Sequence, residues 1–417
     1  MLSKAEAGIV QRDPAVPGLS TVLDADAFAD ALRRRLPAAD LREARITYIR
    51  YKPRTNCLVG YRLEFADWTV AATAKAYQRN ASPGNSGRLV FDDCDVLVSV
   101  FPDDRKITSL PRLAKPDARA RMIRRVVGRH RSSFQEGTIE ELAYKPERRY
   151  VAKLSVSEGP RLVLKFYTER NYLTAWHSSR AFDSRPAVRL APRIGDSDRY
   201  RVLAFGWLPG RRLSDAIGDP NFNIDSLRTV GAAIAELHAQ NPSGLEYRGG
   251  EIEASSLVCD AERLALLCPH LSKRARRLAR TLAAQLVDQA AISRPIHGDL
   301  HAGQILIENG TVGLLDLDRA VRANPMADIG LFIAHLDREH LRGNLESPRV
   351  DELAASFLEG YFDPRAPELG TVRVYRAAAL LRLAPECFRR SEPEWPDRTE
   401  AMLQRSEDIV NREFADS

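Results

Sequence analysis

The residues from Ile296 to Asp318 decide the fold: Ile296-His-Gly-Asp-Leu-His-Ala-Gly-Gln-Ile-Leu-Ile-Glu-Asn-Gly-Thr-Val-Gly-Leu-Leu-Asp-Leu-Asp318. The dipeptide Asn309-Gly310 is typical of the two-residue turn of a β-hairpin, and apolar residues flank it on both sides. The stretch therefore predicts a hairpin whose entry turn carries Asp299 and whose return strand ends at Asp316 and Asp318.

Oxygen-bearing side chains converge at one end of this hairpin, because Gln304 begins its outgoing strand. Carboxylate and amide oxygens are the ligands that Mg²⁺ prefers. A further carboxylate beside such a metal can orient or deprotonate an attacking hydroxyl group. The catalytic and metal loops of kinases present these parts in this order.

The run His297-Gly-Asp-Leu-His-Ala-Gly-Gln304 resembles the aminoglycoside phosphotransferase-like kinases. Within that superfamily it looks most like the maltokinase branch, where Gln commonly stands in place of Asn. The resemblance implies an α+β, bilobal, protein-kinase-like fold. We expect a β-rich N-terminal cap with a linker helix over residues 1–132, a nucleotide-binding lobe and hinge over 133–210, and a helical lobe with both loops over 211–417.

The same resemblance implies a role for each matching residue, with ATP and Mg²⁺ as cofactors. Asp299 would be the catalytic base, and His297 would hold its loop by hydrogen bonds. Asp316 would be the principal Mg²⁺ ligand, with Gln304 supporting the metal and Asp318 as a secondary ligand or a residue on the substrate side.

For several residues around these loops, a structural role is the alternative to a functional one. Asp328 matches a family acid that braces the catalytic loop, and His238 is expected to be a packed structural histidine. Turns favour Asp, Asn and His for structural reasons alone, and this interpretation stays open for Asp318, Asp328 and His301.

A kinase also needs cations on the nucleotide phosphates. Lys165 is a charge inside the apolar run Leu162–Phe166, where it needs a partner, and it occupies the place of the nucleotide-lobe lysine. Arg149 and Lys153 lie on the preceding strand and could reach phosphates. The glutamate that usually pairs with this lysine is missing from residues 171–185, so the partner of Lys165 stays unassigned.

The remaining nucleotide contacts are expected from two segments. Ser157 lies in a phosphate-loop candidate, Ser155–Gly159, that contains one glycine. Phe205 and Trp207 belong to the hinge segment Leu203–Gly210, where apolar flanks suit a flat base.

An internal duplication is predicted upstream of the hairpin. The segments Tyr51-Lys-Pro-Arg54 and Ala74-Lys75-Ala-Tyr77 are echoed by Tyr144-Lys-Pro-Glu147 and Leu164-Lys165-Phe-Tyr167. We interpret Lys75 as a relic or a cap residue. Residues 1–20 are expected to form an irregular arm, Asp24 to cap a helix that ends near Pro37, and residues 118–131 to form a basic linker helix.

The composition excludes several classes of protein. The 62 basic and 56 acidic residues give a net charge of +6, too mild for 417 residues to require a nucleic-acid partner. The five cysteines form no C-x-x-C pair, which argues against a disulfide scaffold and a zinc ribbon. No apolar run suggests a membrane span or a signal peptide, so we expect a cytoplasmic monomer or homodimer.

The function predicted from these observations is transfer of the γ-phosphoryl group of ATP to a hydroxyl of a small molecule, most simply a sugar or amino sugar. An aminoglycoside or amino-alcohol acceptor is one alternative. A pseudokinase that binds nucleotide as a regulatory module is another, because the helix glutamate is missing and the phosphate loop is poor in glycine.

Overall fold

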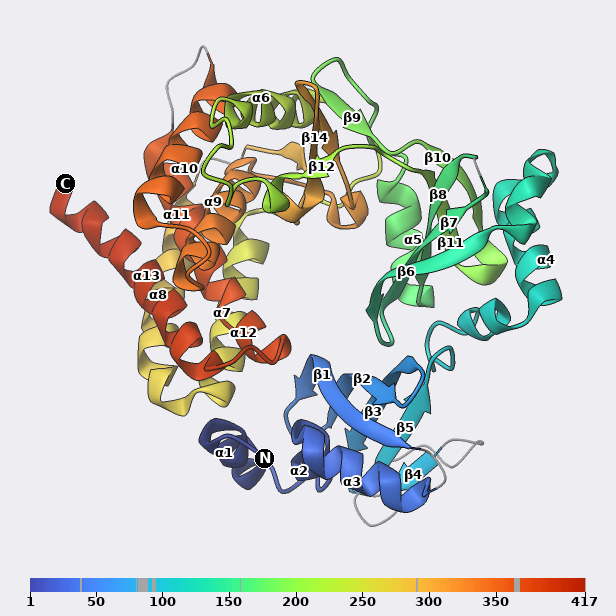
Figure 1. Ribbon diagram of the computed structural model, residues 1–417. Helices are drawn as coiled ribbons and strands as arrows, with labels where there is room; N and C mark the ends of the chain where they lie inside the picture. Colours follow the sequence, from blue (N-terminus) through green and yellow to red (C-terminus); the bar gives the residue numbers. More distant parts are fainter. Residues whose placement is uncertain are drawn as a thin grey trace.

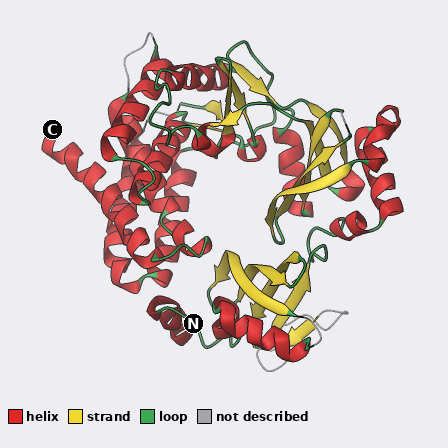
Figure 2. Cartoon of the chain, viewed as in Figure 1, coloured by secondary structure: helices red, strands yellow, loops and turns green. Residues whose placement is uncertain are grey.

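The computed structural model describes residues 1–37, 40–79, 81, 89–91, 95–157, 159–289, 292–363 and 368–416. Two β-sheets occupy the N-terminal half of the chain and helices dominate the C-terminal half, which is the α+β arrangement expected from the sequence (Figure 2). Figure 1 shows the first sheet, the second sheet and the helical part following one another around a ring. In the described part of the chain, no helix is long and apolar enough to cross a membrane.

The first sheet has the strand order β1-β2-β3-β5-β4. Its elements are α1 (Lys4–Arg12), α2 (Leu19–Leu23), α3 (Ala25–Arg35), β1 (Leu41–Lys52), β2 (Asn56–Phe65), β3 (Thr69–Tyr77), β4 (Leu89–Phe91) and β5 (Val96–Val100). The Asp24 carboxylate caps α3 as predicted, accepting hydrogen bonds from the backbone of Asp26 and Ala27. The segment Asn80–Gly87, for which the sequence predicts a loop, lies outside the described residues except for Ala81.

The expectation of an irregular arm over residues 1–20 is wrong. Helix α1 starts at a capping box, in which Ser3 and Glu6 each accept a hydrogen bond from the other's backbone N–H. The prolines and Gly18 that suggested an arm lie in the link between α1 and α2, so they interrupt the helices without abolishing them.

The second sheet has the order β10-β11-β8-β7-β6. Its elements are α4 (Pro116–Val127), β6 (Thr138–Lys145), β7 (Arg149–Ser155), β8 (Arg161–Tyr167), α5 (Glu169–Ser178), β10 (Arg193–Ser197) and β11 (Val202–Gly206). The expected linker helix is α4, and its buried residues Met122, Ile123 and Val126 pack on one face of this sheet.

The two sheets share one topology. Strands β1, β2, β3, β4 and β5 correspond in order to β6, β7, β8, β10 and β11. The two Tyr-Lys-Pro turns are anchored alike: Asp13 accepts hydrogen bonds from the Tyr51 hydroxyl and the Arg54 N–H, as Asp104 does from Tyr144 and Glu147. The predicted duplication is confirmed and extends from a hairpin to the whole five-stranded sheet.

The helical part holds the loops that were singled out in the sequence. The strands here are β9 (Val188–Leu190), β12 (Arg211–Arg212), β13 (Arg294–Ile296), β14 (Ile305–Glu308), β15 (Thr311–Leu314) and β16 (Val321–Ala323). The helices are α6 (Ser226–Ala239), α7 (Gly250–Leu267), α8 (Ser272–Asp288), α9 (Met326–Leu341), α10 (Ser347–Phe362), α11 (Leu369–Leu383), α12 (Glu386–Arg389) and α13 (Trp395–Asp416). Strands β14 and β15 form the predicted hairpin, and positive φ angles at Asn309 and Gly310 build its turn.

The turn anchor gives a stability prediction. Asp104→Ala leaves the half-buried Tyr144 hydroxyl and the buried Glu147 N–H without their acceptor, so we expect the free energy of unfolding to fall by about 2 kcal/mol. Equilibrium urea unfolding measures it. Asp67→Ala, at an exposed position between β2 and β3, is the control and should change it by less than about 0.5 kcal/mol. Equal stabilities of the two variants would contradict the anchor.

Candidate functional site

Hydrogen bonds to Asp328 hold the turn that carries Asp299. The Asp328 carboxylate accepts hydrogen bonds from the backbone N–H groups of His297 (2.6 Å) and Gly298 (2.8 Å). It also accepts one from His238 Nε2 at 3.1 Å. Burial opposes ionisation of Asp328, but the hydrogen bonds from His238 and from the His297 N–H outweigh it and lower its pKa. The bracing expected of Asp328 is therefore present in its contacts.

His297 ties this turn to the acids at the end of the hairpin. Its Nε2–H donates to the carbonyl oxygen of Leu315 at 2.8 Å, and its Nδ1 accepts from the Asp299 N–H at 3.3 Å. Gly298 has a φ of +75°, and a Cβ there would lie 2.2 Å from the carbonyl oxygen of Arg319. Only glycine fits such a close approach at a positive φ, so the turn geometry is dictated by the Gly itself.

Two acids and two cations meet across the gap between the hairpin and the second sheet. Arg149 Nη1 donates to Asp316 Oδ1 (2.6 Å) and Asp318 Oδ2 (2.7 Å). Lys165 Nζ donates to Asp316 Oδ1 (2.8 Å) and Asp318 Oδ1 (3.0 Å). The Tyr167 hydroxyl donates to both oxygens of Asp318, at 3.1 and 3.0 Å. The four charged side chains are mostly buried, so each charge depends on the others.

This cluster answers the question of the partner of Lys165. The sequence of α5 contains one acid, Glu169, and that side chain pairs with Arg201 at 3.2 Å. The partners of Lys165 are Asp316 and Asp318. Burial disfavours the charged lysine, but the two carboxylates outweigh it and raise its pKa. Likewise Lys165 and Arg149 overcome burial and hold the pKa of Asp316 well below its usual range.

The register of the second sheet places three of the expected nucleotide contacts on one face. On β8, Lys165 lies opposite Val151 of β7 and Leu203 of β11. Two residues earlier on β8, Val163 lies opposite Lys153 and Phe205. Directly opposite residues share a face, as do residues two apart. Lys165 Nζ lies 5.4 Å from the ring centre of Phe205. The opposite face packs on α4.

Lys153, Trp207 and Ser157 lie farther from the acids. Lys153 Nζ donates to Glu140 at 2.6 Å and lies 5.8 Å from the ring centre of the half-exposed Trp207. Ser157 is exposed in the turn between β7 and β8, at the end of β7 opposite to Arg149. The turn closer to the acids is the one between β6 and β7, which carries Lys145 and Arg148.

The oxygen donors fit a divalent cation by chemistry. Asp316 and Asp318 supply carboxylate oxygens, and the Gln304 amide lies beside them, with Nε2 3.4 Å from Asp316 Oδ2. Such oxygens are the ligands that Mg²⁺ takes. Lys165 and Arg149 already neutralise both carboxylates. Across the described residues, no group of three or more His, Cys, Asp or Glu side chains is placed to hold a metal.

A cavity of about 790 Å³ joins these acids to the first sheet. Asp299, Asp316 and Asp318 line one side, and residues of β1 and of the segment after β5 line the other. Ten of the lining side chains are basic and five are acidic. The basic ones are Arg50, Lys52, Arg105, Lys106, Lys145, Arg148, Arg149, Arg170, Arg201 and Arg319.

Sequence reasoning missed several residues of this site. Tyr167 lies two residues after Lys165, and Arg319, which lies 3.4 Å from Asp299 Oδ1, follows directly after Asp318. Their proximity to Lys165 and Asp318 in the sequence was an available signal. No sequence signal pointed to Arg50 or Lys52, because only the tertiary structure brings the first sheet to the cavity.

The sequence profile of the phosphotransferase enzyme family, APH, matches residues 142–375, more than half of the 417 residues. The chain belongs to this family. It is a small-molecule kinase, an ATP-dependent phosphotransferase, and its α+β architecture is the expected protein-kinase-like fold. The family profile begins in β6, so it leaves the first sheet outside the match.

Several solved structures are similar to this APH-family chain, and their names differ in the substrate that they state. A choline/ethanolamine kinase family protein from Mesorhizobium loti is 14% identical, covering 67% of this chain and 89% of its own, with a TM-score of 0.48. Choline kinase from Cryptosporidium parvum Iowa II is 10% identical, covering 71% of this chain and 96% of its own, with a TM-score of 0.48. A thermostable mutant of aminoglycoside phosphotransferase APH(4)-Ia is 16% identical, covering 66% of this chain and 94% of its own, with a TM-score of 0.49. A search of curated proteins found no match.

The segment that follows Asp299 gives a pH prediction through His301. Burial lowers the pKa of His301 from 6.5 to about 4, and its Nδ1 accepts a hydrogen bond from the Gly303 N–H. The folded state therefore favours the neutral ring, so this contribution to stability is complete above 6.5 and is lost as the pH falls through about 4.

Urea unfolding of the wild type and of His301→Asn checks this prediction. Asn keeps the hydrogen bond to Gly303 but does not titrate. From about pH 7 to about pH 5, the wild type should lose up to about 2 kcal/mol more than the variant. Parallel losses in the two proteins would show that His301 is not the group that titrates.

Proposed function

We propose that this kinase transfers the γ-phosphoryl group of ATP to a hydroxyl of a sugar-type acceptor, with Asp299 as the catalytic base. The observation that carries the proposal is the cavity in which Asp299 faces the same space as Asp316 and Asp318, opposite Lys165 and Arg149. A base, two metal-type ligands and two phosphate-type cations are the parts that phosphoryl transfer needs.

Each residue contributes by position and charge. Asp299 would accept the proton of the acceptor hydroxyl, and the bonds from His297 and Asp328 would hold it in place. Lys165 and Arg149 would bind the phosphates of the nucleotide, and Phe205 and Trp207 would lie against its base. Lys153 and Ser157 stay in the proposal as more distant nucleotide contacts.

Asp316, Asp318 and Gln304 would hold the Mg²⁺ ion, which when bound neutralises charge on the phosphates. In the structure Lys165 and Arg149 neutralise these carboxylates. Arrival of the metal and the nucleotide would let both cations turn from the carboxylates to the phosphates, so no buried charge is left without a partner.

A sugar-type acceptor is favoured over an aminoglycoside or an amino alcohol. The run His297–Gln304 supports the maltokinase branch because Gln304 stands where most relatives have Asn. The cavity lining adds a physical argument, because its basic excess disfavours a cationic acceptor. The proposal keeps the division of the chain into a cap over residues 1–132, a nucleotide-binding lobe and hinge over 133–210, and a helical lobe over 211–417.

The test is formation of phosphorylated product, detected by mass spectrometry, from Mg-ATP and pooled sugars, amino sugars, amino alcohols and aminoglycosides. Asp299→Asn removes the base without changing the shape of the side chain, so turnover should fall by at least about a hundredfold with the fold retained. Asp67→Asn is the control and should match the wild type. Equal turnover in Asp299→Asn would contradict the assignment of the base. Mg²⁺-dependent ATP binding without product from any pool would favour the alternative of a regulatory pseudokinase.

A further inference from the structure

We propose that the acceptor carries a negatively charged group, a phosphate or a carboxylate, and that Lys52 of the first sheet, Lys106 of the segment after β5 and Arg148 of the β6–β7 turn bind this group in the cavity. The inference rests on the proposed function, because it names the acceptor class for the same site. It also assigns a role to the first sheet, which lies outside the family match.

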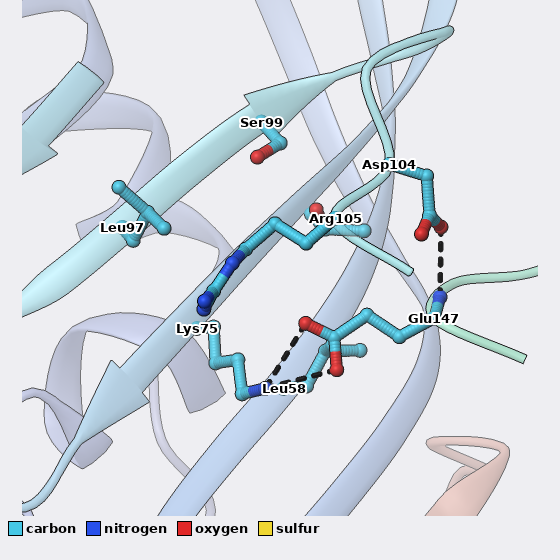
Figure 3. A pocket seen from close by; sticks show the side chains of 8 residues that line it. Leu58, Lys75, Leu97, Ser99, Asp104, Arg105 and Glu147 are labelled. Atoms are coloured by element: carbon cyan, nitrogen blue, oxygen red, sulfur yellow. Dashed lines mark hydrogen bonds and ion pairs between the residues drawn. The ribbon is translucent and has the colours of Figure 1, made fainter. Parts of the chain in front are cut away.

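The first sheet does not hold a second nucleotide, although it repeats the topology of the second. Lys75 occupies the position that corresponds to Lys165 and faces Leu58 and Leu97 across the strands. Glu147, from the β6–β7 turn of the second sheet, closes this face (Figure 3). The space left there is about 10 Å³, which is the room for a single water molecule.

What the first sheet offers is positive charge. Lys75 (2.9 Å), Arg50 (2.7 Å) and Lys106 (3.5 Å) all approach Glu147 Oε2, so three cations share one carboxylate. Arg50 and Lys106 also line the large cavity. The cavity therefore keeps an excess of positive charge at this wall even after the ion pairs are made.

Further cations beside this wall add to the excess. Lys52 and Arg148 line the cavity, and among the described residues no carboxylate lies within ion-pair distance of either. Burial, together with the nearby Arg50 and Arg319, lowers the pKa of Arg148. Cations that face one another in a cavity repel until an anion joins them, which is the charge pattern of an anion site.

The nucleotide by itself does not account for this charge. Lys165 and Arg149, which serve the phosphates in the proposed function, sit on Asp316 and Asp318 at the second sheet. Lys52 comes from β1 of the first sheet and Lys106 from the segment after β5, and both line the same cavity. A triphosphate with a divalent cation offsets only part of the basic excess, which leaves charge for a second anion beside Asp299.

The experiment compares matched acceptors. Several hexoses and polyols are each offered in neutral, amino, carboxylate and phosphate forms with Mg-ATP, and kcat/KM is measured for each form. We expect an anionic form to exceed the neutral form of its scaffold by about tenfold or more, and the amino form to be the poorest. A neutral or amino form as the best acceptor would overturn the inference while leaving the proposed function intact.

Variants locate the anion site. Lys52→Gln and Lys106→Gln should each raise KM for the anionic acceptor by at least about fivefold and leave KM for ATP within about twofold. Both side chains are exposed, so folding is expected to be unaffected. Lys273→Gln, an exposed lysine on α8 away from the cavity, is the matched control. A change in KM for ATP in place of KM for the acceptor would assign these lysines to the nucleotide and overturn the inference.

If no acceptor in the panel yields a product, a binding experiment tests the anion site. Absence of product contradicts the proposed function, and inorganic phosphate is then titrated into protein saturated with Mg²⁺ and a non-hydrolysable ATP analogue. Phosphate binding that is weakened by Lys52→Gln and Lys106→Gln but not by Lys273→Gln upholds the anion site. Equal binding by all four proteins, or none, rejects it.

Discussion

The ion-pair cluster of Asp316 and Asp318 with Lys165 and Arg149 is the interaction on which the site depends. The acids come from the end of the β15 return strand and the cations from β7 and β8, so the cluster joins the helical part to the second sheet. Removing one partner of a buried pair typically costs about 3–5 kcal/mol, because the other charge is left uncompensated. Under the proposed function, a metal ion and phosphates would replace each partner with one of the same sign.

Rigid support of Asp299 complements this exchangeable cluster. Asp328, His238 and His297 are buried and hydrogen-bonded to one another or to backbone groups, so the turn before the hairpin has one conformation available. Positioning of this kind is a principal source of rate in phosphoryl transfer, which involves little covalent chemistry by the protein. The structure thus places a firmly held carboxylate, Asp299, in the same cavity as the ion-paired Asp316 and Asp318.

The two sheets share one topology but differ in the surroundings of their central lysines. Both sheets retain the strand order, the aspartate-anchored Tyr-Lys-Pro turn and the central lysine. In the first sheet, however, the lysine faces Glu147, a side chain of the second sheet, and the space above it has closed. Residues of β1 instead line the cavity that also contains Asp299.

The sequence by itself determined the parts whose signals are local. The Asn309-Gly310 turn, the hairpin around it, the helix capped by Asp24 and the duplication follow from short-range patterns, and the structure confirms them. The family resemblance followed from the order of His297, Asp299, Gln304 and Asp316 along the chain. Helix α1 was missed because a short helix between turn-forming residues has a weak pattern.

Only the tertiary structure decided which charges meet. The partners of Lys165 lie about 150 residues away in the chain, Glu147 reaches Lys75 from another sheet, and Arg50 and Lys52 enter the cavity from outside the family match. Sequence patterns report the periodicity of a helix or strand, but an ion pair depends on distances set by packing. For that reason the reaction class could be read from the residues, while the charge of the cavity required the fold.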